Sequence, residues 1–122
     1  MKRALIIEDN ENNLELISFI LKANGYTSLS AINGQDGVEA ALRELPDFIL
    51  LDIQLPDIPG TEVLRQLRAQ SETASIPIIA VTSYAMAGDR ERLLAAGCDG
   101  YIEKPIDPVL VMKQIEKILK EF

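Results

Sequence analysis

Short hydrophobic runs alternate with longer amphipathic stretches along the whole chain. Five runs have the length and composition of β-strands, at residues 4–7, 26–32, 48–51, 78–81 and 100–103. Each is followed, after a short polar connection, by a segment with the apolar period of about 3.6 residues that is typical of an amphipathic helix. Strands that alternate with helices indicate βα units, whose parallel strands form one sheet. We therefore expect a doubly wound α/β fold with a five-stranded parallel sheet and five flanking helices.

The expected helices have recognisable ends. They span about residues 12–24, 35–45, 60–69, 87–96 and 107–121. Gly25 and Gly97 follow the first and fourth helices, where a residue in the left-handed conformation commonly ends a helix. Pro46 ends the second helix. Asp107 and Pro108 provide an N-cap and a first-turn proline for the last one.

Length and charge restrict the functions that this chain can have. Its 122 residues, of which 48% are hydrophobic, match a single domain over residues 1–122 without an output domain. A formal net charge of -7 argues against nucleic-acid binding, because that affinity comes mainly from lysine and arginine neutralising phosphates. The apolar runs are far shorter than the roughly 20 residues that span a bilayer, and residues 1–3 show no signal-peptide pattern. We expect a cytoplasmic protein that binds neither nucleic acid nor membrane.

Chemically active side chains follow four of the five hydrophobic runs. In chain order they are Glu8 and Asp9, Asp52, Thr82, and Lys104. Because the carboxyl ends of parallel strands meet at one edge of a sheet, where open α/β sheets bind their ligands, these groups should lie close together. Each of them alone is more often a helix cap or a turn residue. Their coincidence at one edge predicts a functional site.

This set of groups suits phosphoryl transfer. Asp52 can act as the nucleophile, since attack on phosphorus depends more on positioning and charge neutralisation than on proton removal. The nearby carboxylates would repel a phosphoryl group, and Mg²⁺ is the hard, oxygen-binding cation that would offset them. We assign Asp9 and Asp52 as direct Mg²⁺ ligands and Glu8 as a ligand through water. Lys104 would hold one phosphoryl oxygen and Thr82 would donate a hydrogen bond to another.

The order and spacing of these motifs closely resemble a response-regulator receiver domain of two-component signalling. The matching motifs extend over essentially the whole chain and are Glu8-Asp9-Asn10, Asp52-Ile53-Gln54-Leu55-Pro56 with Gly60, Thr82-Ser83-Tyr84-Ala85, and Lys104-Pro105. The resemblance implies a flavodoxin-like receiver fold with strand order 2-1-3-4-5. It also adds the backbone carbonyl of Gln54 as a Mg²⁺ ligand. Residues 85–90 resemble, more narrowly, the stand-alone DivK-type regulators and the receivers of hybrid histidine kinases.

The resemblance implies a switch that receives its phosphoryl group from a phosphohistidine on a histidine kinase or phosphotransfer protein. Such a chain is an enzyme only in catalysing its own phosphorylation and dephosphorylation, and it signals to a downstream protein that the sequence does not identify. Thr82 and Tyr101 would form the switch pair. Tyr101 lies three residues before Lys104, so strand alternation places the two side chains on opposite faces. A phosphorelay intermediate and a phosphorylation-independent protein-binding module are the alternatives.

Two residues of the first expected helix are candidates for partner docking. The buried stripe of this helix is centred near Ile17. At about 100° per residue, Phe19 lies roughly 160 to 200° from that centre and Leu14 roughly 60°. We therefore expect an exposed Phe19 and a docking surface that includes Leu14. The alternative is that the neighbouring last helix covers Phe19.

Two other classes with a related fold or nucleophile fit less well. A flavodoxin needs a phosphate loop rich in serine, threonine and glycine after the first strand, but residues 8–12 are acidic and would repel a phosphate. A haloacid-dehalogenase-type phosphatase needs a second aspartate two positions after the nucleophile to act as general acid. This chain has Gln54 there.

Overall fold

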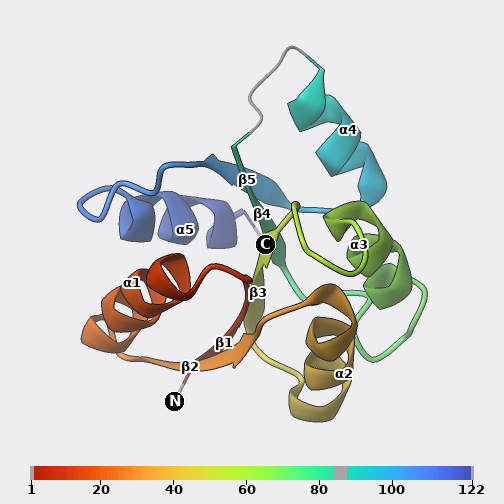
Figure 1. Cartoon of the computed structure of the whole chain (residues 1–122), viewed down its shortest axis with the longest axis horizontal. Helices are drawn as coiled ribbons and strands as arrows, with labels where there is room; N and C mark the ends of the chain where they lie inside the picture. The colour runs from red at the N-terminus through yellow and green to blue at the C-terminus, as the bar shows by residue number, and fades with distance from the viewer. Residues whose placement is uncertain (1, 84–87, 122) are drawn as a thin grey trace.

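The described part of the chain, residues 2–83 and 88–121, forms a parallel sheet flanked by helices in the computed structural model (Figure 1). The strands are β1 (Lys2–Ile7), β2 (Tyr26–Ala31), β3 (Phe48–Asp52), β4 (Ile78–Thr82) and β5 (Gly100–Glu103). The helices are α1 (Glu11–Ala23), α2 (Gly34–Glu44), α3 (Gly60–Arg68), α4 (Asp89–Ala96) and α5 (Val111–Leu119). The strand order is β2-β1-β3-β4-β5. The expected fold and strand order are confirmed.

Helices cover both faces of the sheet (Figure 1). Side chains from α1 and α5 form one apolar core with the sheet, and side chains from α2, α3 and α4 form the other. Every residue of β3 and β4 is buried, which explains why these two strands are apolar without alternation up to their last residues, Asp52 and Thr82. The ends of β3 and β4 therefore lie at the centre of the carboxyl edge, between the two helical layers.

Most helix ends follow the expected capping chemistry. Gly25 and Gly97 adopt φ values of +87° and +117°, the left-handed conformation that glycine adopts most easily. Asn10 caps α1 by accepting a hydrogen bond from the Asn13 N–H at 3.0 Å, so the helix begins at Glu11. The described part of α4 begins two residues later than the expected start, and residues 84–87 lie outside the described part of the chain.

The start of the last helix differs from the sequence-based expectation. The Asp107 carboxylate accepts a hydrogen bond from the Val109 N–H at 2.9 Å, and the Asp107 carbonyl accepts one from the Leu110 N–H at 3.1 Å. These bonds close a turn over residues 108–110, and α5 begins only at Val111. Asp107 thus caps a turn that precedes the helix. Among the described residues, no helix combines the length and the apolar character needed to cross a membrane.

Candidate functional site

The carboxyl edge of the sheet brings the expected side chains together. Glu8 follows β1 directly, Asp52 ends β3 and Thr82 ends β4, and all three are buried, at 2%, 3% and 2% exposure. Lys104 follows β5 and its backbone N–H donates to the Thr82 carbonyl at 2.8 Å. The parallel register pairs Asp52 with Val81 and Thr82 with Glu103, so these strand ends are level. The sequence prediction of a shared edge is confirmed.

Lys104 lies between two of the buried carboxylates. Its Nζ is 3.1 Å from Glu8 Oε1 and 3.1 Å from Asp52 Oδ2. Burial opposes the ammonium charge, but the bonds to Glu8 and the charge of Asp52 outweigh it and raise the pKa of Lys104 above its usual value. The ammonium is therefore present at neutral pH and partly offsets the negative charge at this edge.

One ammonium does not neutralise the cluster. Burial, and then the neighbouring Asp52 carboxyl, raise the pKa of Glu8 to about 7 although Lys104 acts in the opposite direction. Asp9 adds a third carboxylate from the exposed side of the cluster. Oxygen atoms of Glu8, Asp9 and Asp52 lie within 4.8 Å of one another. An all-oxygen donor set with excess negative charge fits a hard divalent cation such as Mg²⁺.

The loop after β3 is held against the Asp52 side chain. The Gln54 N–H donates to Asp52 Oδ1 at 3.0 Å, and the Gly60 N–H donates to the Ile53 carbonyl at 2.9 Å. A Cβ at position 60 would lie 2.6 Å from Ile53 Cα, so this close approach requires glycine. The sequence pattern did not indicate this role of Gly60. It also gave no signal for Asp57, whose carboxylate joins this loop to α2.

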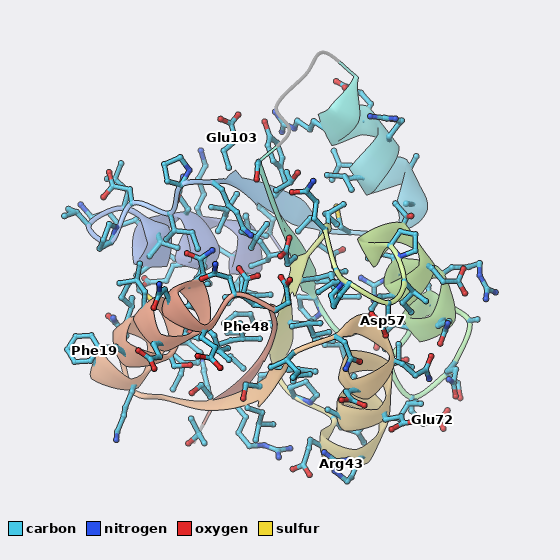
Figure 2. The ribbon with its side chains drawn as sticks, in the orientation of Figure 1. Phe19, Arg43, Phe48, Asp57, Glu72 and Glu103 are labelled. Carbon is cyan, nitrogen blue, oxygen red and sulfur yellow. The ribbon has the colours of Figure 1, made fainter. Side chains whose placement is uncertain are left out.

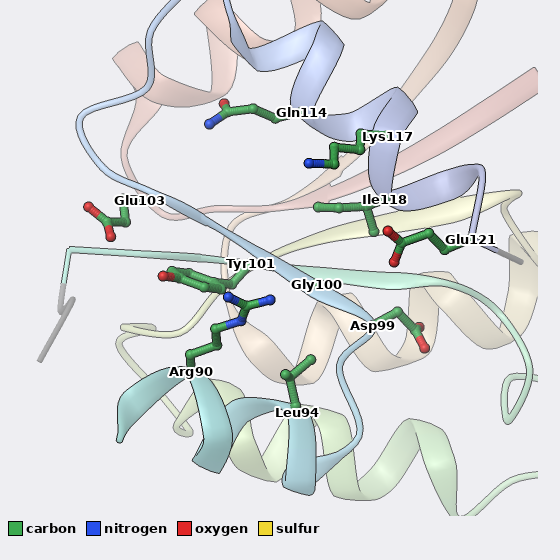
Figure 3. A pocket seen from close by; sticks show the side chains of 10 residues that line it. All are labelled: Arg90, Leu94, Asp99, Gly100, Tyr101, Glu103, Gln114, Lys117, Ile118 and Glu121. Atoms are coloured by element: carbon green, nitrogen blue, oxygen red, sulfur yellow. The ribbon is translucent and has the colours of Figure 1, made fainter. Parts of the chain in front are cut away.

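Tyr101 lies on the face of the sheet that carries α2, α3 and α4, as the strand alternation predicted. It packs at the edge of that core, and the Arg90 guanidinium lies over its ring at 5.8 Å from the ring centroid. Figure 3 shows Arg90 and Leu94 from α4 on one side of Tyr101, with Gln114 and Lys117 from α5 on the other. Together these residues line a groove between α4, β5 and α5.

The two docking candidates on α1 have different environments. Phe19 is 73% exposed and points away from the sheet in Figure 2, so α5 does not cover it. Leu14 is half-buried and packs against the core beneath α1 and α5. The expected exposure of Phe19 is confirmed. Its role in docking remains a prediction. Residues 84–87, which include Tyr84 and Ala85 of the matching motif, lie outside the described residues.

Comparison with known proteins identifies the family. The model of the response regulator receiver domain family matches residues 4–116. The polar-differentiation response regulator DivK of Brucella anthropi is 42% identical over 118 residues, which cover 97% of this chain and 96% of that protein. DivK of Brucella melitensis is 41% identical with the same coverage. The chain therefore belongs to the response regulator receiver domain family of two-component signalling.

Solved structures agree with this assignment. A CheY-like receiver domain protein from Methanospirillum hungatei is 33% identical with a TM-score of 0.89, over 99% of this chain and 95% of that one. The receiver domain of the sensor histidine kinase PA1611 from Pseudomonas aeruginosa is 34% identical with a TM-score of 0.88, over 98% of each chain. That structure is described as having a magnesium ion coordinated in its active-site cleft.

Proposed function

We propose that this chain is a Mg²⁺-dependent phosphoacceptor switch whose acceptor is Asp52. The observation that carries the proposal is the placement of one buried carboxylate within reach of both an ammonium group and a cluster of oxygen ligands. Asp52, Glu8 and Asp9 supply the oxygens, and Lys104 supplies the ammonium. The phosphoryl donor is a phosphohistidine on a histidine kinase or phosphotransfer protein, as in other receiver domains.

In the proposed reaction, a carboxylate oxygen of Asp52 attacks the phosphorus of the phosphohistidine. The new P–O bond forms as the P–N bond breaks, and the histidine nitrogen leaves with the bonding electron pair. Lys104 is already bonded to Asp52 Oδ2 and can transfer this charge-assisted bond to a phosphoryl oxygen. Asp9, Asp52, the Gln54 carbonyl and, through water, Glu8 would hold Mg²⁺. When bound, this ion neutralises negative charge on the transferring group. Attack of water on the phosphorus then breaks the P–O bond to Asp52, releases inorganic phosphate and restores the carboxylate.

Thr82 is proposed to report the phosphorylation state to Tyr101. When Asp52 carries a phosphoryl group, the Thr82 hydroxyl forms a charge-assisted hydrogen bond to a phosphoryl oxygen. Phosphorylation therefore shifts a pre-existing two-state equilibrium by no more than the resulting difference in interaction energy between the two states, roughly 1 to 3 kcal/mol. The groove between α4, β5 and α5, which Tyr101 lines, is the surface that this shift would remodel.

Replacing Thr82 by alanine should leave Asp52 able to accept a phosphoryl group but remove the effect of phosphorylation on partner affinity. Wild-type phosphorylation should tighten partner binding by about 5- to 150-fold, and the variant should lose that factor. Thr82→Ser is the matched control, because it keeps the hydroxyl and should retain the effect. The measurement is partner affinity by calorimetry with and without phosphorylation. If Thr82→Ala shows the full wild-type tightening, the coupling from Thr82 to Tyr101 is wrong.

Phe19 is proposed to contact the phosphoryl donor protein. Phe19→Ser should slow transfer from the kinase by about tenfold, the loss expected when truncation removes an interface residue that contributes more than 1 kcal/mol. The thermal stability of the Phe19→Ser variant should equal that of the wild type, because the Phe19 side chain is mostly exposed. Ile32→Ser, at another exposed apolar position, should leave transfer unchanged. A large loss of stability in Phe19→Ser, or equal transfer rates in both variants, would rule out docking through Phe19.

Two other uses of the same site are distinguishable. A phosphorelay intermediate would return its phosphoryl group to a second histidine-containing protein, whereas an end switch would lose it mainly to water. A binding module that works without phosphorylation would show the same partner affinity in both states. The presence of Asp9, Asp52, Thr82 and Lys104 together at the carboxyl edge favours the phosphorylated switch over this last alternative.

A further inference from the structure

The loop between β3 and α3, residues 53–59, carries one proposed Mg²⁺ ligand and is anchored at both ends. Next to the acceptor, the Gln54 N–H donates to Asp52 Oδ1 at 3.0 Å. At the other end, the Gly60 N–H donates to the Ile53 carbonyl at 2.9 Å. These bonds close the base of the loop. They leave its middle to be positioned by other contacts.

Asp57 provides those contacts from the middle of the loop. Its two carboxylate oxygens accept hydrogen bonds from consecutive backbone N–H groups at the start of α2: Oδ1 from Gly34 at 2.7 Å and Oδ2 from Gln35 at 2.9 Å. These hydrogen bonds lower the pKa of Asp57, and the bond from Gln35 contributes more than the bond from Gly34. The carboxylate is therefore charged at neutral pH. Figure 2 shows Asp57 between α2 and α3.

This cap does not come from α2 itself. Asn33, the residue before the helix, already caps α2 by accepting from the Asp36 N–H at 2.8 Å. Asp57 satisfies two further N–H groups of the same helix end from 22 and 23 residues away along the chain. Its bonds therefore connect two elements, whereas the Asn33 bond lies within one.

Apolar side chains also pack closely where the loop meets the start of α2. A Cβ added to Gly34 would lie 2.5 Å from Ile58 Cγ1 and 2.9 Å from Val63 Cγ2. Only glycine at position 34 lets the loop and the helix approach to this distance. The polar contact of Asp57 and the apolar contact of Ile58 thus fix neighbouring loop residues against α2.

We propose that Asp57 is a positioning residue that holds the loop after β3 in the conformation needed to bind a divalent cation at Asp52. The inference rests on the proposed function, because it concerns the site formed by Asp9, Asp52 and the Gln54 carbonyl. Gln54 is only three residues from Asp57, so release of Asp57 from α2 leaves the hydrogen bonds at the base of the loop to hold the segment that carries this ligand. A group that orients metal ligands without touching the metal typically contributes about 10- to 100-fold in affinity.

The test compares two variants that each remove a cap from the same end of α2. Asp57→Ala removes the two bonds that join the loop to the helix, and Asn33→Ala removes the two side-chain bonds that Asn33 makes with Asp36 at the start of the same helix. Mg²⁺ affinity is measured by titration calorimetry on the unphosphorylated chain, and stability by thermal denaturation without Mg²⁺. Both variants should lower the melting temperature by about 4 to 8 °C. Only Asp57→Ala should raise the Mg²⁺ Kd, by about tenfold.

The possible outcomes distinguish a failure of the proposed function from a failure of the positioning role of Asp57. If the wild-type chain does not bind Mg²⁺, the proposed function fails. If the wild type binds and Asp57→Ala binds equally well, or if Asn33→Ala loses as much affinity, Asp57 is only a helix cap and the inference is overturned. Should Asp57→Ala not fold, Asp57→Asn replaces it, because the amide keeps one acceptor oxygen. An expected loss of about threefold then supports the inference, and an unchanged Kd overturns it.

Discussion

Replacing Asp52 by asparagine should abolish phosphorylation and leave the fold intact. A neutral side-chain amide is a much poorer nucleophile toward phosphorus than a carboxylate. The rate of phosphate incorporation into the chain should therefore fall by at least about 10³-fold. The change is nearly isosteric and removes the repulsion between Asp52 and the buried Glu8 carboxyl, while Lys104 keeps its ion pair with Glu8 at 3.1 Å. The free energy of unfolding should therefore change by no more than about 1 kcal/mol.

The measurement is incorporation of phosphate from a phosphorylated kinase, with circular dichroism on the same samples to follow folding. Asp47→Asn is the matched control, because Asp47 lies just before β3, at the opposite end of the strand from the site. It should accept phosphate at the wild-type rate. Stable incorporation at a normal rate in Asp52→Asn would mean that Asp52 is not the acceptor.

Removing Asp9 should weaken Mg²⁺ binding more than neutralising Glu8 does. Asp9 approaches the oxygen cluster from the solvent side and is assigned as a direct ligand, so Asp9→Ala should raise the Mg²⁺ Kd by about 100-fold or more. Glu8 is already bonded to Lys104 and is assigned as a ligand through water. Glu8→Gln should raise the Kd by only about threefold to tenfold.

Calorimetric titration of the two variants and the wild type at one pH and ionic strength decides this ranking. Glu15→Gln, a charge-removing change at an exposed position on α1, controls for the general loss of negative charge and should bind like the wild type. Equal losses in Asp9→Ala and Glu8→Gln, or a larger loss in Glu8→Gln, would contradict the assignment of direct and water-mediated ligands.

The sequence was sufficient for the elements that local rules determine. Apolar runs predicted β3 and β4, because both faces of these strands are covered. Gly25 and Gly97 predicted helix ends, because both adopt positive φ. The meeting of Glu8 and Asp52 followed from topology alone, since parallel strands end at the same edge. The exposure of Phe19 followed from helical periodicity.

Features that depend on contacts between distant segments could not be predicted in this way. Asp57 resembles an ordinary loop residue until the start of α2 is known to lie beside it. Arg68 is similar: its guanidinium bonds to the Gly97 carbonyl at 2.9 Å and to Asp99 at 2.8 Å, and these partners lie about 30 residues further along the chain. The predicted start of α5 was wrong, because Asp107 and Pro108 suit a turn as well as the start of a helix.

The proposed function requires that Asp52 accepts a phosphoryl group with the help of a divalent cation. The direct test incubates the wild-type chain with acetyl phosphate, with and without Mg²⁺, and measures the intact mass. Fragmentation of the modified chain then locates the added group. We expect the mass of one added phosphoryl group, located on Asp52 and present only with Mg²⁺. An unchanged mass in the presence of Mg²⁺, or a phosphoryl group located on another residue, would contradict it.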